Sequence, residues 1–320
     1  MRLFVTGASG FVGKSLLEDL LKEGHEVYGL VREERMAEFP KERKAKPVIG
    51  DLFAVKHFKN KLYGMDAVIH LGARIKFVGG LDDFYAINVA ATSDLIHSAI
   101  EEGVKKFIYV SAAAIVLDGN SLIDITEEYR PGKMIRSNYL KSKLLAEDKI
   151  LKRRKEIQVI ILRPPVIWGP DMRIMEAFKS TIRKMGFPTI GDINHHLATC
   201  HVKNLNAAIL QSLKSKNGEG IYLISDGEKV QTKKFMSELI EGYGMEMGNM
   251  HMPKKTALLM AGFLEFIWKV FHIQHELPIT TLIVHLMGTE FTINDTKARK
   301  ELGYRNVISI EQGLRQLQDV

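Results

Sequence analysis

Tyr139 and Lys143 stand four residues apart in the segment YLKSK. On a helix this spacing puts both side chains on one face. A lysine ammonium beside a phenol favours the phenolate and lowers a pKa that is normally about 10. The pair can therefore act as a general acid or base at a hydroxyl or carbonyl group. Because Tyr-x-x-x-Lys pairs are also common on plain surface helices, the elements around this one must decide what it does.

The chain opens with a strand, a glycine-rich turn, a helix and a second strand. Residues 3–5 and 27–31 are short apolar runs, and Gly7, Gly10 and Gly13 follow the first run at three-residue spacing. Positions without side chains let backbone N–H groups and the positive end of a helix dipole touch a pyrophosphate. Because the glycines follow a strand and open a helix, the pattern predicts a dinucleotide-binding unit rather than an unliganded turn.

Later short apolar runs have the length of buried strands, and helical patterns separate them. The runs lie at residues 47–49, 67–71, 107–110, 159–162 and 221–224. Such alternation predicts a parallel sheet covered by helices on both faces. A ligand of such a sheet binds at the carboxyl ends of the strands, so the residues directly after each strand carry the chemistry.

The composition bounds the class of protein. The chain has 320 residues, 46% of them hydrophobic and 26% charged, with a formal net charge of +7 and one cysteine, Cys200. These values are ordinary for a soluble enzyme. One cysteine excludes an internal disulfide framework and fits a reducing compartment. Because the first strand begins at residue 2, we expect no signal peptide and a cytoplasmic location.

The excess of positive charge is not organised as a nucleic-acid surface. The basic run at residues 152–155 has no interleaved aromatic residues and no nucleic-acid motif. It is better explained as the solvated end of the helix that carries Tyr139, where cations complement the helix dipole. We expect no nucleic-acid partner.

Residues 256–271 are strongly apolar but too short to span a bilayer, and Glu265 and Lys269 interrupt them at helical spacing. We expect an amphipathic helix over a core or a pocket, and weak peripheral membrane contact remains an alternative. Its apolar face would either cover the substrate or pack in the core through Phe263, Phe266, Ile267 and Phe271.

Three histidines lie close together in the sequence, at His195, His196 and His201. No carboxylate or cysteine arrangement with the usual spacing of a zinc site accompanies them. We therefore assign no metal.

The motifs together resemble the extended short-chain dehydrogenase/reductase superfamily. They are TGASGFVG at residues 6–13, GDL at 50–52, HLGA at 70–73, YLKSK at 139–143 and RPPVIWGP at 163–170. The segments at 201–210, 222–228 and 295–305 are most similar to the 3β-hydroxysteroid dehydrogenase family and its dihydroflavonol-reductase-like relatives.

The resemblance implies an α/β fold: a Rossmann doubly wound parallel sheet with a smaller, discontinuous, mostly helical substrate domain. Residues 1–170 plus 201–226 would form the NAD(P)-binding domain, and residues 171–200 plus 227–320 the substrate domain.

The resemblance also implies roles for individual residues. Tyr139 and Lys143 would be catalytic, with a cationic nicotinamide adding to the effect of Lys143 on the phenol. Asn88 would hold a proton-relay water, although a helix asparagine bonded locally explains it nearly as well. Asp51 would meet the adenine ring or only form a turn. The implied cofactor contacts are Thr6, Gly7, Gly10, Phe11, Val12, Gly13, Arg32, Asp51, Leu52, Leu71, Gly72, Ala73, Tyr139, Lys143, Pro165 and Val166.

Two positions depart from the family pattern. Where an NAD-binding member carries an acidic residue after the second strand, this chain has Val31 and Arg32. A guanidinium there suits the 2′-phosphate of NADP(H), so we expect NADP(H) rather than NAD(H).

The second departure concerns the catalytic hydroxyl. Aligning residues 107–110 with the family strand puts the usual Ser/Thr position at Ala112, with Ser111 one residue early. Consecutive strand residues face opposite sides, so Ser111 does not automatically replace the missing group. We keep Ser111 as the candidate hydroxyl, because a register error of one residue at the strand end would restore a Ser/Tyr/Lys site.

We therefore expect an NADP(H)-dependent oxidoreductase that interconverts a carbonyl and a secondary alcohol on a small hydrophobic, ring-containing, sterol- or flavonoid-like substrate. A homodimer is compatible with this reading. One alternative is a nucleotide-sugar epimerase or dehydratase, which shares the Tyr/Lys pair. Another is a non-catalytic NADPH-binding sensor or scaffold, for which Ala112 is the best support.

Overall fold

The computed structural model describes residues 1–42, 44–76, 78–130, 137–172, 175, 182, 186–271, 277 and 279–318. Its centre is a seven-stranded sheet in the order β12-β7-β5-β4-β1-β2-β3, in which every pairing is parallel. The strands are β1 (Arg2–Thr6), β2 (Glu26–Val31), β3 (Lys46–Ile49), β4 (Ala67–His70), β5 (Lys106–Val110), β7 (Gln158–Arg163) and β12 (Gly220–Leu223). The predicted doubly wound sheet is confirmed.

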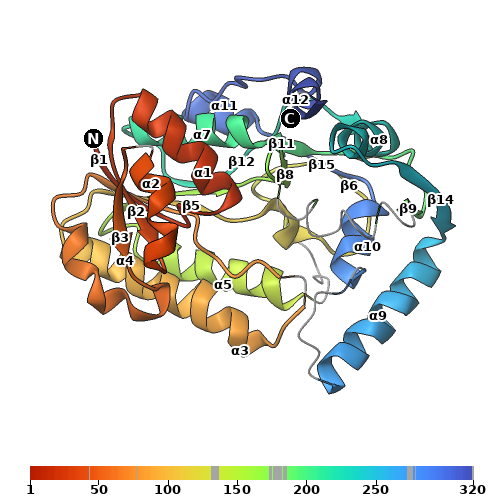
Figure 1. Ribbon diagram of the computed structural model, residues 1–320, viewed down its shortest axis with the longest axis horizontal. Coiled ribbons are helices and arrows are strands. Elements are labelled where there is room, and N and C mark those ends of the chain that lie inside the picture. Colours follow the sequence, from red (N-terminus) through yellow and green to blue (C-terminus); the bar gives the residue numbers. More distant parts are fainter. Residues whose placement is uncertain are drawn as a thin grey trace.

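Helices cover both faces of this sheet (Figure 1). Helices α1 (Phe11–Lys22) and α7 (Val202–Lys214) pack on one face, against the strand residues Leu3, Ile108 and Ile160. Helices α4 (Ala91–Glu101) and α5 (Asn138–Leu151) pack on the other, against Phe4, Phe107 and Val159. Alternate residues of each strand thus serve two separate cores, which explains why the strands read as continuous apolar runs.

Shorter elements connect the strands in the first half of the chain. They are α2 (Glu38–Glu42), α3 (Leu81–Phe84), the π-helical turn η4 (Tyr85–Ala90), and the 3-10 turns η1 (Glu34–Met36), η2 (Leu52–His57), η3 (Lys59–Leu62) and η5 (Ala113–Val116).

The C-terminal part combines short strands with helices. Its strands are β8 (Val166–Trp168), β9 (Phe187–Ile190), β10 (His196–Leu197), β11 (Thr199–His201), β13 (Val230–Gln231), β14 (Met247–Met252) and β15 (Phe291–Ile293). Its helices are α8 (Thr232–Gly242), α9 (Lys254–Val270), α10 (Thr281–Met287), α11 (Thr296–Glu301) and α12 (Ile310–Gln318). A four-stranded sheet in the order β13-β10-β15-β6 recruits β6 (Leu122–Ile125) from the first half of the chain.

The amphipathic segment after residue 253 forms α9, and three of its aromatic residues lie outside the core. Phe263, Phe266 and Phe271 are 63%, 64% and 72% exposed. The buried side of the helix is formed by the small residues Ala257 and Ala261, which let its backbone approach the body closely. The predicted packing of these three residues in the core is therefore wrong, and the role of this face in covering a substrate stays a prediction.

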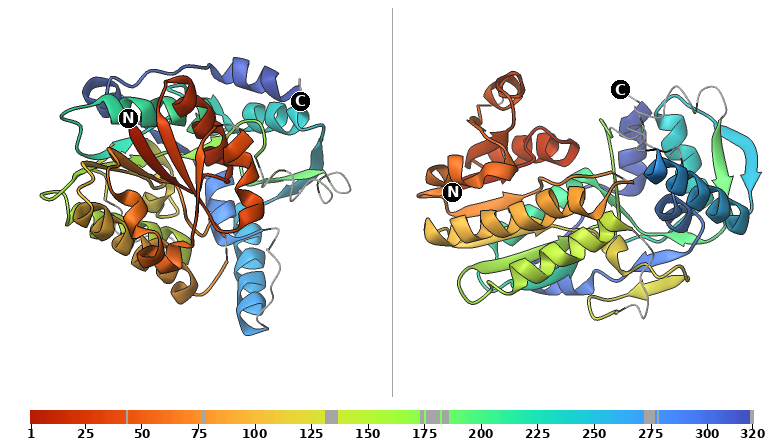
Figure 2. Two further views of the ribbon diagram at one scale, coloured as in Figure 1. Left: turned by 60° about the vertical axis from the view of Figure 1, so that its left-hand side comes forward. Right: turned by 90° about the horizontal axis from the view of Figure 1, so that it is seen from below.

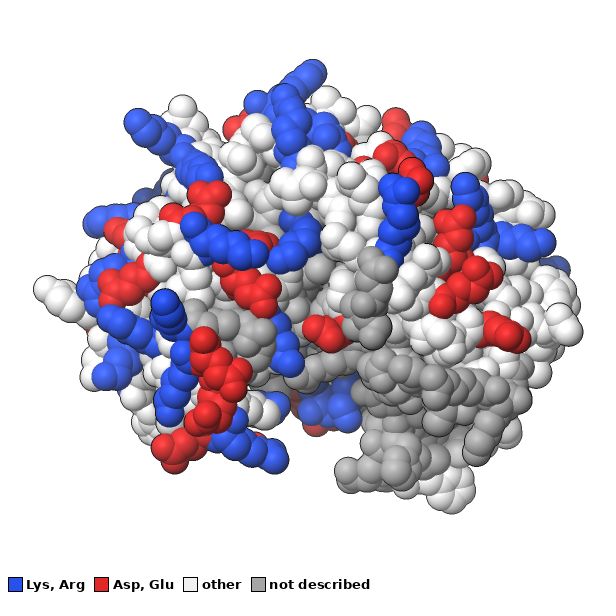
Figure 3. All heavy atoms as spheres, turned by 45° about the horizontal axis from the view of Figure 1, so that its top comes forward, with Lys and Arg blue, Asp and Glu red and all other residues white. Residues whose placement is uncertain are grey.

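Charged side chains of both signs are interspersed on the face shown in Figure 3, which displays no continuous basic stripe. Within the described residues, no helix has the length and apolar character needed to cross a membrane.

Candidate active site

Helix α5 brings Tyr139 and Lys143 to the carboxyl end of β5. Ser137 caps the helix, its Oγ accepting a hydrogen bond from the Leu140 N–H at 3.3 Å. Lys143 is only 3% exposed. Its ammonium donates to the Val110 carbonyl oxygen at 2.7 Å and lies 4.3 Å from the centre of the Tyr109 ring. The lysine is thus anchored at the last residue of the strand.

Burial moves the pKa of both groups toward their neutral forms. Desolvation lowers the pKa of Lys143 to about 7, although Glu147 opposes the shift. Desolvation raises the pKa of Tyr139 to about 12. The expected lowering of the Tyr139 pKa by Lys143 is not seen, because burial disfavours the charged phenolate and raises the pKa instead. Tyr139 is therefore protonated at neutral pH, as a proton donor must be.

One turn beyond Lys143, Glu147 ties the helix to the sheet. Arg163, at the end of β7, donates to both carboxylate oxygens of Glu147, at 2.9 and 2.5 Å. The side chains are 5% and 1% exposed. The sequence analysis did not predict this pair. Its only signal in the sequence was Glu147 itself, a carboxylate four residues after Lys143 and therefore on the same helix face.

Asn88 lies in the π-helical turn η4 and is 1% exposed. Its amide accepts from the Arg74 N–H at 2.7 Å and donates to the Arg74 carbonyl oxygen at 3.2 Å and to Ser142 Oγ at 2.9 Å. Ser142 Oγ in turn donates to the Tyr139 carbonyl oxygen at 2.7 Å. Both amide hydrogens are used, so Asn88 clamps the loop after β4 to helix α5. These partners lie 14 and 54 residues away in the sequence, so the bonding of Asn88 is not local to its helix, and the relay water stays a prediction.

The two candidates for the catalytic hydroxyl position differ in their surroundings. Ser111 is 5% exposed, and its Oγ has no hydrogen-bond partner among the described residues. It therefore does not bond the Tyr139 phenol. Ala112 is half-buried and packs on the same apolar cluster as Tyr139. The assignment of the family position to Ala112 remains a prediction.

The turn between β1 and α1 has the shape that a pyrophosphate requires. Gly7 has φ +70°, which L side chains rarely adopt, and a Cβ on Gly13 would lie 2.1 Å from the Gly7 carbonyl oxygen. Gly10 caps α1 without a side-chain bond, and the first turn holds no acidic residue. The N–H groups of Phe11, Val12 and Gly13 therefore face outward without helical partners. These residues fit the phosphates of a dinucleotide.

A buried network positions the loop after β4 against this turn. Thr6 Oγ1 accepts from the Gly72 N–H at 3.0 Å and bonds His70 Nδ1 at 2.6 Å. His70 Nε2 bonds Thr92 Oγ1 at 2.8 Å. Desolvation lowers the pKa of His70 to about 3, so the ring is neutral. The Thr6 side chain thus holds the loop of Leu71, Gly72 and Ala73 in place. Because the Thr6 hydroxyl is used in this way, only the backbone of Thr6 is left to contact a cofactor.

At the opposite end of the predicted cofactor site, Arg32 is exposed directly after β2 and has no ion-pair partner among the described residues. The nearby Glu33 is paired with Arg35 at 2.5 Å. Asp51 Oδ1 accepts from the Phe53 N–H at 3.0 Å, which leaves its second oxygen for an adenine amine. Leu52 is half-buried, and its Cδ1 would lie 2.7 Å from a Cβ placed on Gly72.

Pro165 and Val166 are half-buried at the start of β8, and Val166 pairs with Thr199 of β11. The three histidines have separate contacts: His195 Nδ1 bonds the Asp192 carbonyl oxygen at 2.5 Å, His196 pairs with Glu290 at 3.4 Å, and His201 Nδ1 accepts from the Lys203 N–H at 3.2 Å. The described part of the chain holds no group of three side chains suited to a metal.

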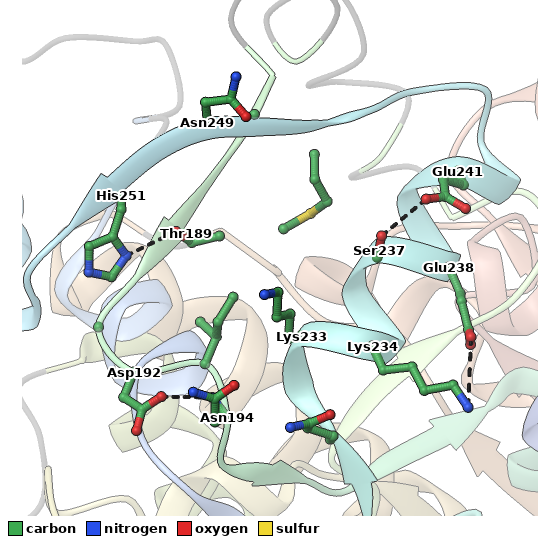
Figure 4. A pocket seen from close by; sticks show the side chains of 15 residues that line it. Thr189, Asp192, Asn194, Lys233, Lys234, Ser237, Glu238, Glu241, Asn249 and His251 are labelled. Atoms are coloured by element: carbon green, nitrogen blue, oxygen red, sulfur yellow. Dashed lines mark hydrogen bonds and ion pairs between the residues drawn. The ribbon is translucent and has the colours of Figure 1, made fainter.

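A cavity of about 1030 Å³ lies elsewhere, between α8 and the strands β9 and β14 (Figure 4). Its polar lining is largely paired within itself. Lys234 and Glu238 are 3.9 Å apart, Ser237 donates to Glu241 at 3.1 Å, and Thr189 Oγ1 lies 3.1 Å from His251 Nδ1. None of the predicted site residues lines it, so we do not assign the reaction to this cavity.

The sequence pattern of the 3-beta hydroxysteroid dehydrogenase/isomerase family matches residues 4–254. A 4-hydroxy-2-methyl-3-oxo-4-farnesyl-3,4-dihydroquinoline-1-oxide ketoreductase from Stigmatella aurantiaca is 31% identical over 98% of this chain and 95% of its own. A decarboxylating sterol-4-alpha-carboxylate 3-dehydrogenase from Dictyostelium discoideum is 28% identical over 98% and 99%.

Among solved structures, the UDP-glucuronic acid 4-epimerase from Bacillus cereus in complex with NAD superposes with a TM-score of 0.74 at 18% identity, over 100% of this chain and 98% of its own. At this identity the likeness concerns the fold.

Proposed function

The chain belongs to the 3-beta hydroxysteroid dehydrogenase/isomerase family, and from that premise we propose that it uses NADP(H) to interconvert a carbonyl and a secondary alcohol on a hydrophobic, ring-containing substrate. It is an NAD(P)-dependent oxidoreductase acting on CH–OH or C=O groups. The observation that carries the proposal is the half-buried Tyr139 on the same helix face as the buried Lys143, at the carboxyl edge of a sheet whose first turn fits a pyrophosphate.

The residues divide the work as follows. A nicotinamide cofactor, when bound, would supply or accept the hydride at the carbonyl carbon. In reduction, Tyr139 donates its phenolic proton to the carbonyl oxygen, and a pKa of about 12 keeps that proton in place until the oxygen becomes basic. Lys143 lies on the same helix face and stabilises the phenolate that remains.

The apolar surroundings of Tyr139 support the substrate class. Ala112, Ala114 and Leu144 pack on the same cluster, and the Phe84 ring lies 6.2 Å from the Tyr139 ring. The names of the relatives from Stigmatella and Dictyostelium describe a farnesylated quinoline and a sterol. These apolar neighbours of Tyr139 favour a substrate with an apolar ring system over a charged nucleotide sugar.

The exposed Arg32 supports the choice of NADP(H), since its guanidinium can form charge-assisted hydrogen bonds to a 2′-phosphate. An epimerase that retains NAD would not need this cation. A non-catalytic sensor would need neither Tyr139 nor Lys143. Because Ala112 lacks a catalytic hydroxyl, the turnover experiment below also tests the sensor alternative.

The first experiment measures the affinities of the full chain for NADPH and NADH by calorimetry. We expect tighter binding of NADPH. One charge-assisted hydrogen bond is worth roughly 1.5–3 kcal/mol, so Arg32→Asp should weaken NADPH binding by about 10- to 100-fold. Arg35→Gln is the matched control, because that guanidinium is already paired with Glu33. Equal or tighter binding of NADH by the unmodified protein contradicts the NADP(H) assignment.

The second experiment follows reduced-nicotinamide absorbance across a panel of ring ketones and secondary alcohols. Turnover of such compounds supports the proposal. Turnover confined to nucleotide sugars favours an epimerase or dehydratase, and cofactor binding without any turnover favours a sensor.

A further inference from the structure

Arg74 is a cation beside helix α5 that the described residues compensate only in part. Its side chain is 32% exposed, and its Nε is buried without a hydrogen-bond partner in the part of the chain that the structure describes. The carboxylate that pairs with it is that of Asp83, whose Oδ2 lies 3.9 Å from Arg74 Nη2, too far for a hydrogen bond. Because the Asp83 side chain is 55% exposed, this pair contributes little. Buried polar groups normally have hydrogen-bond partners, so this guanidinium suggests a site for an anion.

The backbone of Arg74 is fixed against α5. Its N–H donates to Asn88 Oδ1 at 2.7 Å, and its carbonyl oxygen accepts from Asn88 Nδ2 at 3.2 Å. The same Nδ2 donates to Ser142 Oγ on α5. Because Lys143 is the next residue of α5, Arg74 starts from a point that is fixed relative to the Tyr139 and Lys143 pair. A cation held at its base loses little freedom when it binds a ligand.

One aromatic ring connects the guanidinium with the proposed proton donor. The continuous helical segment formed by α3, η4 and α4 runs beside α5 (Figure 1 and the right view of Figure 2). On this segment, the Phe84 ring lies 5.9 Å from the guanidinium carbon of Arg74 and 6.2 Å from the ring of Tyr139. Phe84 is 1% exposed, so its position between the two side chains is set by packing. An acidic group a few bonds from the reacting carbonyl would therefore be within reach of Arg74.

Two kinds of anion could meet this guanidinium, a phosphate of the cofactor and a carboxylate of the substrate. The pyrophosphate of a dinucleotide already fits the glycine turn and the free N–H groups at the start of α1. Arg74 instead lies where Asn88 and Phe84 connect the loop after β4 to α5, the helix that carries Tyr139. A carboxylate is planar and can accept two parallel hydrogen bonds from a guanidinium. The place of Arg74 therefore favours a carboxylate of the substrate.

We propose that Arg74 binds a carboxylate group of the substrate, close to the carbonyl or hydroxyl group on which Tyr139 acts. This inference rests on the proposed function and narrows its substrate to an apolar ring compound with one acidic group near the reacting carbon. Arg74 is then a specificity-determining residue, because a neutral analogue of the same shape leaves the guanidinium without its hydrogen bonds.

The test measures equilibrium binding of a ring hydroxy acid, 2-hydroxycyclohexanecarboxylate, and of its methyl ester to the full chain saturated with NADP+. The Tyr139→Phe variant is the background, because it is expected to block turnover while it keeps the aromatic ring. In calorimetry we expect the acid to bind roughly 10- to 100-fold more tightly than the ester, the effect of one charge-assisted hydrogen bond. Arg74→Gln should abolish this preference and leave the affinity for the ester unchanged.

Two further variants separate a specific site from a general effect of charge. Arg74→Lys keeps the charge but loses the planar guanidinium, so it should recover only part of the preference for the acid. Arg315→Gln is the matched control and should leave the preference unchanged, because this guanidinium lies on α12 and is 64% exposed. With Tyr139 restored, Arg74→Gln should raise KM for the acid by about 10- to 100-fold and change kcat little. Circular dichroism melting curves check that the variants remain folded.

Three results would overturn the inference. The first is equal binding of acid and ester by the Tyr139→Phe background, which leaves the proposed function intact if neutral ring ketones are reduced. The second is a preference for the acid that survives Arg74→Gln. The third is a loss of NADPH affinity in Arg74→Gln as large as the loss for the acid, which would assign the guanidinium to a cofactor phosphate. If binding of the acid depends on Arg74 but no ring alcohol or ketone is turned over, the carboxylate site stands and the proposed reaction fails.

Discussion

The Tyr139 side chain packs among apolar residues and carries one polar atom, its phenolic oxygen. Tyr139→Phe removes that atom and keeps the ring. We expect a rate lower by roughly 10²–10⁴-fold with an identified substrate, as is typical when a general acid is lost, while cofactor affinity and melting temperature stay close to those of the unmodified protein. Tyr63→Phe, at a ring 74% exposed, is the control. Near-normal turnover of Tyr139→Phe would remove Tyr139 from the mechanism.

Ala112 is predicted to occupy the family position of the catalytic hydroxyl, where its methyl group offers no donor to the reacting oxygen. One preorganised donor to a developing oxyanion is worth roughly 10²–10³-fold in rate. We expect Ala112→Ser to raise the rate of reduction by about tenfold or more, measured as kcat/KM on the same substrate.

Ser111→Ala completes this comparison. The Ser111 hydroxyl is buried and has no hydrogen-bond partner in the described part of the chain, so its removal should not destabilise the fold. We expect little change in rate. A large loss in Ser111→Ala, with no gain in Ala112→Ser, would show that Ser111 is the catalytic hydroxyl and that the register of the family alignment is shifted by one residue.

Lys143 makes stability depend on pH. Its pKa of about 7 in the folded chain is lower than its ordinary 10.5. Below pH 7 both states carry the charge, and the folded state bears the whole cost of burying it. Between pH 7 and 10.5 the folded state has lost the proton and the unfolded state has not, so the cost falls as pH rises.

We therefore expect Lys143→Met to unfold at higher denaturant concentration than the unmodified protein at pH 6. A shift of this size corresponds to at most about 5 kcal/mol, and the lost hydrogen bond to Val110 offsets roughly 1–3 kcal/mol of it. The net gain of about 2–4 kcal/mol should shrink toward pH 10. Equal stabilities at pH 6 would show that the buried ammonium is compensated in a way that the structure does not display.

Among the elements, helix α5 depends on a contact that its own sequence does not reveal. Glu147 and Arg163 connect the helix to β7 through a buried two-bond pair. Glu147→Gln leaves the Arg163 charge without its counterion. We expect a loss of about 3 kcal/mol in the free energy of unfolding, measured by urea titration.

Asp148→Asn is the matched control for this prediction, because Asp148 is the next residue on the helix and is exposed. Combining Glu147→Met with Arg163→Met should recover most of the loss, since apolar residues of similar size often replace a buried pair without cost. If the double variant were as unstable as Glu147→Gln, the charged pair would be needed to hold helix α5 in place, and apolar side chains could not replace it.

At the scale of the whole molecule, Asp226 joins segments that are far apart in the sequence. Its 2% exposed carboxylate accepts hydrogen bonds from Trp168, Thr199, the His201 N–H and Asn204, at 2.7–2.8 Å. Asn204 also bonds the Ile308 carbonyl oxygen at 2.9 Å, which extends the network to the C-terminal segment. Helix α7, which packs on the sheet, and the C-terminal part therefore share one buried carboxylate.

Asp226→Asn replaces one carboxylate oxygen, which accepts hydrogen bonds, by an NH2 group. That group is itself a donor and would face the donors that now bond the oxygen. We expect a loss of about 2–4 kcal/mol in stability and a single unfolding transition that moves as a whole in calorimetry. Asp82→Asn, at an exposed carboxylate, serves as control. If the C-terminal part of the variant melted separately while the part with the seven-stranded sheet kept its melting temperature, Asp226 would stabilise the C-terminal part alone.

Periodic and local signals were sufficient to predict the parallel sheet, which is confirmed. Strand-length apolar runs and the spacing of Gly7, Gly10 and Gly13 predict it because they depend on neighbours a few residues away. The segment YLKSK likewise predicts that Tyr139 and Lys143 share a helix face, and the structure has both residues on α5. The NADP(H) preference and the catalytic roles remain predictions, since they concern a bound partner.

Only the tertiary structure decided the state of these groups and the exposure of α9. The pKa values of Tyr139 and Lys143 follow from burial, and strand residues more than thirty positions away, such as Val110, help to create that burial. The Glu147 and Arg163 pair and the bonds to Asp226 join residues that no periodicity relates. The aromatic side of α9 reads as a core face in the sequence, yet Ala257 and Ala261 pack inward and leave Phe263 and Phe266 exposed. The solvent exposure of a side chain depends on every atom packed near it, and those atoms come from parts of the chain that are far apart in the sequence.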